Sequence, residues 1–229
     1  PINSIRILVG SKGSGKSAIL NYLNLLSPQF KIPCLYLKPD DLTIDNLSNA
    51  GSMAMIKRSL YSNLVYSIAA NIGKGLKGVI SENEASLIDK AVAEGTRDPT
   101  TTQRLLSVLL PIGKGLSKID FNSAIQRNNK STGYVRAINS ILEKDRSLFY
   151  LLIDDTDQVC LPSENNFLEV IWGFILAAQK IAEEVASIRI IISIRSEIWR
   201  RMVYDDHGAK DQVDHFRSNT RELKNTRKT

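Results

Sequence analysis

A glycine-rich stretch near the start of the chain has the residue types that bind phosphate. Gly10–Ser17 reads GSKGSGKS and fits the pattern G-x-x-x-x-G-K-[ST] at every fixed position. Glycines let backbone N–H groups turn inward around a phosphate, where a Cβ would be in the way. Lys16 can neutralise β- and γ-phosphate oxygens, and the Ser17 hydroxyl can bind Mg²⁺. The stretch predicts a nucleoside triphosphate site made by Gly10, Ser11, Lys12, Gly13, Ser14, Gly15, Lys16 and Ser17.

Two aspartates after a second apolar stretch are candidates for the metal and water chemistry of the same site. The apolar residues Tyr150–Ile153 lead directly into Asp154 and Asp155. A carboxylate at the tip of a buried strand can hold Mg²⁺ through water, so Asp154 is the expected metal ligand together with Ser17. Asp155 is the candidate base that orients or deprotonates the attacking water. Asp157 is a rival for that role, and a turn or helix-cap residue is the alternative for Asp154.

Arg195 is a third candidate, because it ends the apolar stretch Ile188–Ile194. In one large class of phosphate-loop ATPases, an additional strand separates the loop strand from the acidic strand and carries a polar γ-phosphate sensor at its tip. Ile188–Ile194 suits that strand, and Arg195 would then sense the γ-phosphate or stabilise its charge. A surface ion pair is the alternative for Arg195.

These side chains need strands and helices that bring them to one place. Ser4–Val9 is short, apolar and β-branched, which predicts a buried strand before the glycine-rich loop. Apolar residues at helical spacing predict a helix from about Gly15 to Leu26, and Cys34–Leu37 predicts a second strand. The order strand, loop, helix, strand is typical of an α/β fold. We therefore expect a three-layer sandwich around a mainly parallel sheet.

The later part of the chain repeats this alternation of strand and helix. Ser147–Ile153 predicts the strand before the aspartates, and a long amphipathic helix is expected over about 164–186. Ile188–Ile194 predicts a fourth strand, and a short helix is expected near Glu197–Tyr204. The residues that could do chemistry thus fall after the strands, where an α/β sheet binds its ligands.

A long stretch between the second and third strands has a different pattern. It is too long for an ordinary crossover, and its helical spacing predicts a large helical insertion. Ser81–Glu84 has the form of a capping box, and further helices are expected at Thr102–Leu110 and Tyr134–Lys144. The sequence IGKGL occurs twice, at Ile72–Leu76 and Ile112–Leu116. We expect flexible helix-to-helix turns at both copies, with a DNA- or partner-contacting hairpin as the alternative.

The chain is therefore expected to form one domain with an insertion. Its core would lie over about 1–40 and 147–205, the insertion over about 41–146, and a polar, basic tail over 206–229. A hydrophobic content of 43% excludes a wholly disordered chain. The length of 229 residues suits a single α/β domain that carries such an insertion.

Charge and cysteine content limit the partners and the compartment. The chain has a formal net charge of +6, but residues 217–229 contain five basic residues and one acidic residue. A solvated basic tail is therefore expected, and nucleic-acid binding is only weakly supported. Cys34 and Cys160 cannot form a disulfide scaffold and are expected to be inert packing groups. No apolar stretch is long enough to span a bilayer, so we expect a cytoplasmic protein without a membrane partner.

Three segments together carry a family resemblance. With Gly10–Ser17, Leu151–Asp157 (LLIDDTD) and Ile190–Trp199 (IIISIRSEIW), the sequence resembles P-loop NTPases of the additional-strand (ASCE) class. Within that class it is similar to the STAND and KAP-like groups of prokaryotic signalling ATPases. Some members act as nucleotide-switched sensors or as ATPase partners of anti-phage effectors. The resemblance covers the expected core and does not extend to the insertion.

The resemblance also has departures. Many of these ATPases carry Glu where Asp155 stands, and the shorter side chain implies slow hydrolysis. KAP-type members usually have Arg at the position of Gln158, so an arginine finger is not expected there. A fifth core strand and a helical lid, which the class implies after Arg195, are not recognisable before Thr229. The resemblance therefore implies a module that continues further.

The absence of GTPase motifs favours ATP as the nucleotide. Asn129–Thr132 and Ser117–Asp120 each break the N-K-x-D pattern, and no D-x-x-G occurs at the acidic strand. We expect a Mg²⁺-dependent ATP-binding switch with slow hydrolysis that controls an effector, with a homo-oligomer or a separate effector protein as partner. The alternatives are a structural scaffold that binds ATP with little turnover and a DNA-stimulated motor.

Overall fold

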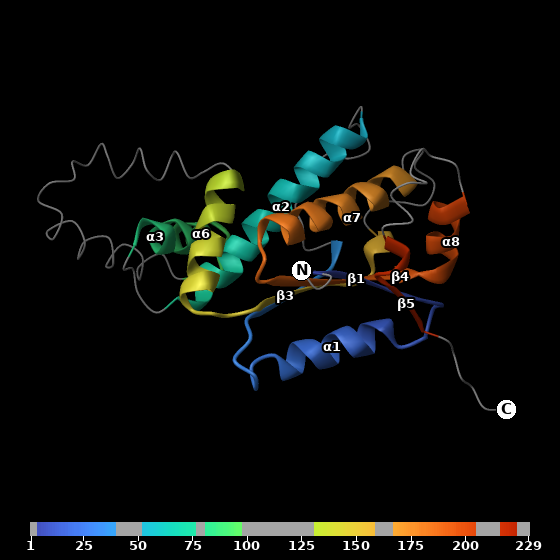
Figure 1. Ribbon diagram of the computed structural model, residues 1–229, viewed down its shortest axis with the longest axis horizontal. Coiled ribbons are helices and arrows are strands. Elements are labelled where there is room, and N and C mark those ends of the chain that lie inside the picture. Colours follow the sequence, from blue (N-terminus) through green and yellow to red (C-terminus); the bar gives the residue numbers. More distant parts are fainter. Residues whose placement is uncertain are drawn as a thin grey trace, which may run out of the picture. The chain divides into compact units, whose positions relative to one another are not determined.

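A computed structural model describes residues 4–39, 52–76, 81–97, 131–158, 167–204 and 216–223 (Figure 1). The chain divides into two compact units, one made of 1–63 with 148–229 and the other of 64–147. The first unit holds the sheet, whose strands are β1 (Ile5–Gly10), β2 (Cys34–Leu37), β3 (Phe149–Ile153), β4 (Ile188–Arg195) and β5 (Thr220–Leu223).

The sheet is parallel throughout and has the order β2-β3-β4-β1-β5. Strand β4 lies between β1 and β3, which confirms the expected position of the additional strand. Gly10 at the end of β1 is in register with Arg195, and Ile153 at the end of β3 is in register with Ile192. Because parallel strands share one carboxyl edge, the ends of β1, β3 and β4 meet where α/β sheets bind ligands.

Helices cover both faces of this sheet, which confirms the α/β fold and is compatible with a three-layer sandwich. In Figure 1, α1 (Lys16–Leu26) lies on one face and α7 (Phe167–Glu184) on the other. The central strands are apolar along their length because both of their sides are buried. Ile7, Leu152 and Ile192 are fully buried and represent this core on three neighbouring strands.

Helix α8 (Ser196–Tyr204) follows β4 directly and joins an aromatic cluster. Trp172 of α7 lies 6.3 Å from Trp199 of α8 and 6.0 Å from Phe216, measured between ring centroids. Phe216 is only 2% exposed and precedes β5. The three rings therefore link α7, α8 and the last described segment of the chain.

Strand β5 corrects the expectation of a polar tail over 206–229 and of no fifth core strand. Its backbone pairs with β1, with Ile7 in register with Thr220, and the Ile7 N–H donates to the Asn219 carbonyl at 3.0 Å. The sequence of β5, Thr-Arg-Glu-Leu, has no apolar run because this strand lies at the sheet edge and stays partly exposed. The basic residues of this stretch therefore belong in part to an ordered strand.

Helix α2 (Met53–Gly75) begins in the first unit and ends in the second. Its first half belongs to the sheet unit, whereas the sequence analysis placed all of 41–146 in the insertion. A Cβ at Gly173 of α7 would lie 2.6 Å from Ile56 Cγ2, so this glycine lets the start of α2 pack closely on α7. The Tyr61 hydroxyl donates to the Glu184 carboxylate and adds a polar contact between the same helices.

The second unit contains the rest of α2 together with α3 (Glu82–Ala93) and α6 (Ser131–Lys144). The capping box of α3 is confirmed, since Ser81 and Glu84 each accept a 3.3 Å bond from the other's backbone N–H. Buried Glu84 also forms a 3.0 Å ion pair with Lys144 of α6. The expected insertion is therefore helical in its described residues, and the predicted helix at Thr102–Leu110 lies outside them.

The first IGKGL copy forms the last turn of α2 and does not form the flexible turn that the sequence analysis expected. A Cβ at Gly73 would overlap the Leu87 carbonyl, so the glycine permits close packing of α2 on α3. Arg97 donates to the carbonyls of Gly73 and Leu76 at 2.6 and 2.8 Å, which caps the helix end. The second copy, 112–116, lies outside the described residues.

Two further expectations concern thiols and membrane spans. Burial raises the pKa of the Cys34 thiol, in agreement with an unreactive packing group. Cys160 lies outside the described residues. Among the described helices, none combines the length and apolar character that crossing a bilayer requires.

Candidate nucleotide and metal site

The glycine-rich loop connects β1 to α1 and takes its shape from its own residues. Gly13 and Gly15 have φ angles of 79° and 90°, in the left-handed region that other L-residues rarely adopt. The Ser14 N–H donates to the Ser11 carbonyl at 3.1 Å and closes a turn within the loop. Gly15 is the N-cap of α1, whose first turn contains no acidic residue. The positive end of the helix dipole at the loop is therefore not neutralised from within α1.

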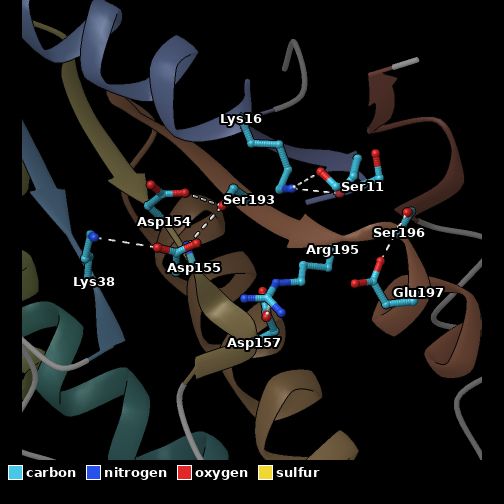
Figure 2. Close-up of polar contacts among 11 residues, drawn as sticks. Ser11, Lys16, Lys38, Asp154, Asp155, Asp157, Ser193, Arg195, Ser196 and Glu197 are labelled. Carbon is cyan, nitrogen blue, oxygen red and sulfur yellow. Dashed lines mark hydrogen bonds and ion pairs between the residues drawn. The ribbon is translucent and has the colours of Figure 1, made fainter. Parts of the chain in front are cut away.

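Lys16 adds a full positive charge to this helix end. Its Nζ donates to the Gly10 carbonyl at 2.7 Å and to the Ser11 carbonyl at 3.1 Å (Figure 2). The residue is only 8% exposed, so its ammonium group is held within the loop and does not extend into solvent. Both of these partners are neutral carbonyls, which leave the charge of Lys16 available to an anion.

Asp154 follows β3 and is fully buried. The Tyr36 hydroxyl donates to its Oδ2 at 2.7 Å, and the Ser193 hydroxyl donates to its Oδ1 at 2.5 Å. Burial acts to raise the pKa of Asp154, but hydrogen bonds from Ser193, Tyr36 and Ser17 outweigh it and leave the pKa below its usual range. Asp154 is therefore an ionised carboxylate whose two oxygens accept hydrogen bonds from neighbouring strands.

Asp155 is adjacent in sequence but has a different environment. Its φ of 50° is left-handed, and its backbone N–H donates to Ser193 Oγ at 3.0 Å. Its Oδ2 lies 3.6 Å from the Nζ of Lys38, which follows β2 (Figure 2). A quarter of the Asp155 side chain is exposed. The carboxylate proposed as a base thus lies beside the metal-ligand candidate but forms an ion pair with a lysine.

Arg195 and Asp157 form a second ion pair at the same edge of the sheet. Arg195 Nε lies 2.9 Å from Asp157 Oδ2, and the Asp157 side chain is only 6% exposed (Figure 2). Burial raises the pKa of Asp157, although the charges of Arg195 and Lys16 counteract this effect. Asp157 Oδ1 is buried without a hydrogen-bond partner among the described residues. Arg195 thus forms an ion pair with a buried partner, and its role as a γ-phosphate sensor stays a prediction.

The sequence analysis missed three residues of this site. Tyr36 and Ser193 hydrogen-bond Asp154, and Lys38 pairs with Asp155. Ser193 carries the clearest signal, because it is a polar residue between the buried Ile192 and Ile194 near the end of β4. Tyr36 and Lys38 have no such signal, since their role depends on β2 lying next to β3.

The oxygen atoms of this site suit a small divalent cation. The glycine-rich loop that contains Ser17 and the carboxylate of Asp154 lie at the same edge of the sheet, although they come from distant parts of the sequence. Hydroxyl and carboxylate oxygens are the protein ligands that Mg²⁺ prefers when it is bound with a phosphate substrate. The residues present therefore fit the metal that the sequence predicts.

Comparisons with known proteins add no relatives to this description. A scan against models of protein families finds no match, and a search of curated proteins finds none either. The resemblance to additional-strand ATPases therefore stays a prediction based on the three sequence motifs.

Proposed function

We propose that this protein binds ATP with Mg²⁺, hydrolyses it slowly, and uses the change of nucleotide state to control an effector. The observation that carries the proposal is the strand register, which brings the glycine-rich loop after β1 and the Asp154 carboxylate after β3 to the same edge of the sheet, on either side of β4. Lys16 lies in the same loop, next to the helix N-terminus. Phosphate-binding groups and cation-binding oxygens therefore occur together at one edge of the sheet.

The loop would bind the triphosphate through its backbone N–H groups and through Lys16. On binding, the Lys16 ammonium exchanges its two carbonyl partners for β- and γ-phosphate oxygens. Ser17 and Asp154 would hold Mg²⁺, directly or through water, and the bound ion would neutralise charge on the β- and γ-phosphates. The helix dipole of α1 acts in the same direction.

Asp155 is the proposed base for the attacking water, and two features limit its rate. Its side chain is short, and its carboxylate is paired with Lys38. Asp157 remains the rival, because it has a buried oxygen without a described hydrogen-bond partner and interacts electrostatically with Lys16. Arg195 would stabilise γ-phosphate charge once it exchanges the Asp157 carboxylate for the phosphate.

The switch role and its partners rest on the resemblance to STAND and KAP-like ATPases. It implies a homo-oligomer or a separate effector protein, with anti-phage defence as one setting. An ATP-bound scaffold and a DNA-stimulated motor are the alternative roles, and each makes a different prediction for turnover. A scaffold would bind ATP without hydrolysis above background, and a motor would be stimulated by DNA.

Phosphate release and ATP binding distinguish these roles. The wild type is compared with Lys16→Ala and Asp155→Ala. Lys12→Ala serves as a control, because Lys12 stands at a variable position of the pattern, where only its backbone N–H is expected to face the phosphate, and its side chain is exposed. We expect slow Mg²⁺-dependent release by the wild type and by Lys12→Ala, and background release by the other two variants. Equal background rates in all four proteins, with ATP still bound by the wild type, would favour the scaffold. Failure of the wild type to bind ATP would contradict the proposal.

A further inference from the structure

Tyr36 contacts the acidic strand end from a position that the glycine-rich loop does not reach. It lies in β2, which pairs with β3, and its register partner is Leu152. The side chain extends beyond that level, and its hydroxyl donates to Asp154 Oδ2 at 2.7 Å. A serine or threonine at this position would be too short to reach the same oxygen, so the length of the tyrosine side chain is essential to the contact.

The other oxygen of Asp154 is held from the opposite side. Ser193 belongs to β4, which flanks β3 on the side away from β2. Its hydroxyl donates to Oδ1 of Asp154 and accepts a bond from the Asp155 N–H. The carboxylate is therefore fixed at both oxygens by hydroxyl groups from the two neighbouring strands. Rotation of the carboxylate would break both of these bonds.

The two hydroxyl contacts leave carboxylate lone pairs free for a cation. A carboxylate has about four lone-pair sites, so two donated bonds occupy only part of its capacity. The remaining sites can contact a metal ion or its water. The Tyr36 hydroxyl donates its proton to Asp154 Oδ2 in a hydrogen bond of 2.7 Å. Tyr36 therefore orients the carboxylate and does not compete with it as an anionic ligand.

We infer that Tyr36 is a positioning residue for the metal ligand. Its hydroxyl holds the Asp154 carboxylate in one orientation, and the remaining lone pairs would be available to the Mg²⁺ that accompanies ATP. This inference rests on the proposed function, since it concerns the same metal site. Groups that orient a metal ligand from outside the coordination sphere typically control metal affinity more than they control binding of the other ligands.

The test removes only the hydroxyl group, in the variant Tyr36→Phe of the full chain. Binding of Mn²⁺, used as a paramagnetic substitute for Mg²⁺, is measured by electron paramagnetic resonance in the presence of a non-hydrolysable ATP analogue. We expect the Kd of Mn²⁺ to rise about tenfold. The Kd of the analogue, measured in EDTA, should stay unchanged. Tyr22→Phe is the control, because Tyr22 is 62% exposed on α1.

A second variant and a kinetic measurement keep the test independent of folding. Ser193→Ala removes the other hydroxyl and should also weaken Mn²⁺ binding, whereas thermal unfolding without nucleotide identifies any variant that fails to fold. In turnover, Tyr36→Phe should raise the Mg²⁺ concentration for half-maximal rate while the KM for ATP at saturating Mg²⁺ stays the same.

The outcomes separate this inference from the function on which it rests. Unchanged Mn²⁺ affinity in folded Tyr36→Phe, with a wild type that binds Mn²⁺ and the analogue, would overturn the positioning role alone. Equal weakening of the analogue in EDTA would also overturn it, because the hydroxyl would then support the whole loop. If the wild type binds neither the analogue nor Mn²⁺, the proposed function itself fails.

Discussion

The glycine-rich loop and the acidic strand end meet at one edge of the sheet but are held in place by different means. The loop is shaped by its own backbone, through left-handed glycines and a turn between Ser11 and Ser14. Asp154 is held by side chains from the strands on either side of it, Tyr36 and Ser193. The loop therefore depends on consecutive residues, whereas the acidic end depends on the order of the strands. Changes in β2 or β4 should act on Asp154 without altering the loop.

The largest loss of turnover is expected from a substitution in the glycine-rich loop. Lys16→Ala removes the charge next to the helix N-terminus and should lower turnover by at least about 100-fold. Radiolabelled phosphate release at saturating ATP measures the effect, with Lys12→Ala as the control from the same loop. Turnover in Lys16→Ala close to that of Lys12→Ala would show that the loop does not bind the triphosphate.

At the acidic end, substitution of two aspartates should change stability with opposite pH dependence. The pKa of Asp154 is lowered, so its contribution to stability is present above the ordinary pKa and is lost as pH falls through the lowered value. The pKa of Asp157 is raised, so its ionisation costs stability as pH rises through the raised value. Relative to the wild type, Asp154→Asn should therefore be more destabilising at pH ~7 than at pH ~3. Asp157→Asn should show the opposite dependence and be less destabilising at pH ~7 than at pH ~3.

Urea unfolding of both variants at several pH values tests this difference. For Asp154→Asn we expect a loss of about 2 kcal/mol in the free energy of unfolding near neutral pH, because bonds to a buried charged group are removed. The two variants serve as controls for each other, since both replace a buried carboxylate by an amide. The same pH dependence in both variants would contradict the different environments described for Asp154 and Asp157.

A glycine substitution tests whether the loop is independent of the strands. Gly15→Ala places a Cβ at a φ of 90°, which costs about 1–2 kcal/mol and should weaken ATP binding about tenfold. Affinity for an ATP analogue without metal measures the effect. Gly75→Ala is the control, because Gly75 ends α2 in open space. If Gly15→Ala lowers the affinity for Mn²⁺ at saturating analogue as much as it lowers the affinity for the analogue, the loop and the acidic strand end do not act independently.

The smallest effect concerns the ion pair at Asp155. Lys38→Met should raise turnover by no more than about threefold, because a half-exposed pair at 3.6 Å contributes little in water. The rise follows from freeing the Asp155 carboxylate for the attacking water. Lys180→Met is a matched control, since Lys180 forms a similarly exposed pair with Glu184 at 3.8 Å. A fall in turnover in Lys38→Met alone would indicate that Lys38 itself contacts the phosphate.

The same contrast explains which parts of the site the sequence could predict. The place of the loop between β1 and α1 was predicted, because the strand, the loop and the helix follow one another directly in the sequence. The position of β4 between β1 and β3 was also predicted, since the end of its apolar run at Arg195 suited an additional strand. Tyr36 was missed because a tyrosine in a short apolar strand usually packs, and its contact with Asp154 requires knowledge of the pairing of β2 with β3.

Element boundaries show the same dependence on context. Buried strands such as β3 were found because both faces are covered and the residues are apolar. Strand β5 was missed because an edge strand needs no apolar run, and its pairing with β1 is what defines it. The start of the insertion was also misplaced, since the helical spacing of α2 continues from one unit into the other. The spacing of apolar residues along α2 alone does not reveal where the insertion begins.

The aromatic cluster gives the protein an intrinsic fluorescent probe. The sequence contains two tryptophans, and both lie in that cluster, one in α7 and one in α8. Helix α8 starts at the residue after Arg195, so any shift of this arginine toward a bound phosphate would be transmitted to the Trp199 indole within about one helical turn. Intrinsic emission at tryptophan excitation would therefore follow the γ-phosphate in real time, without an attached dye.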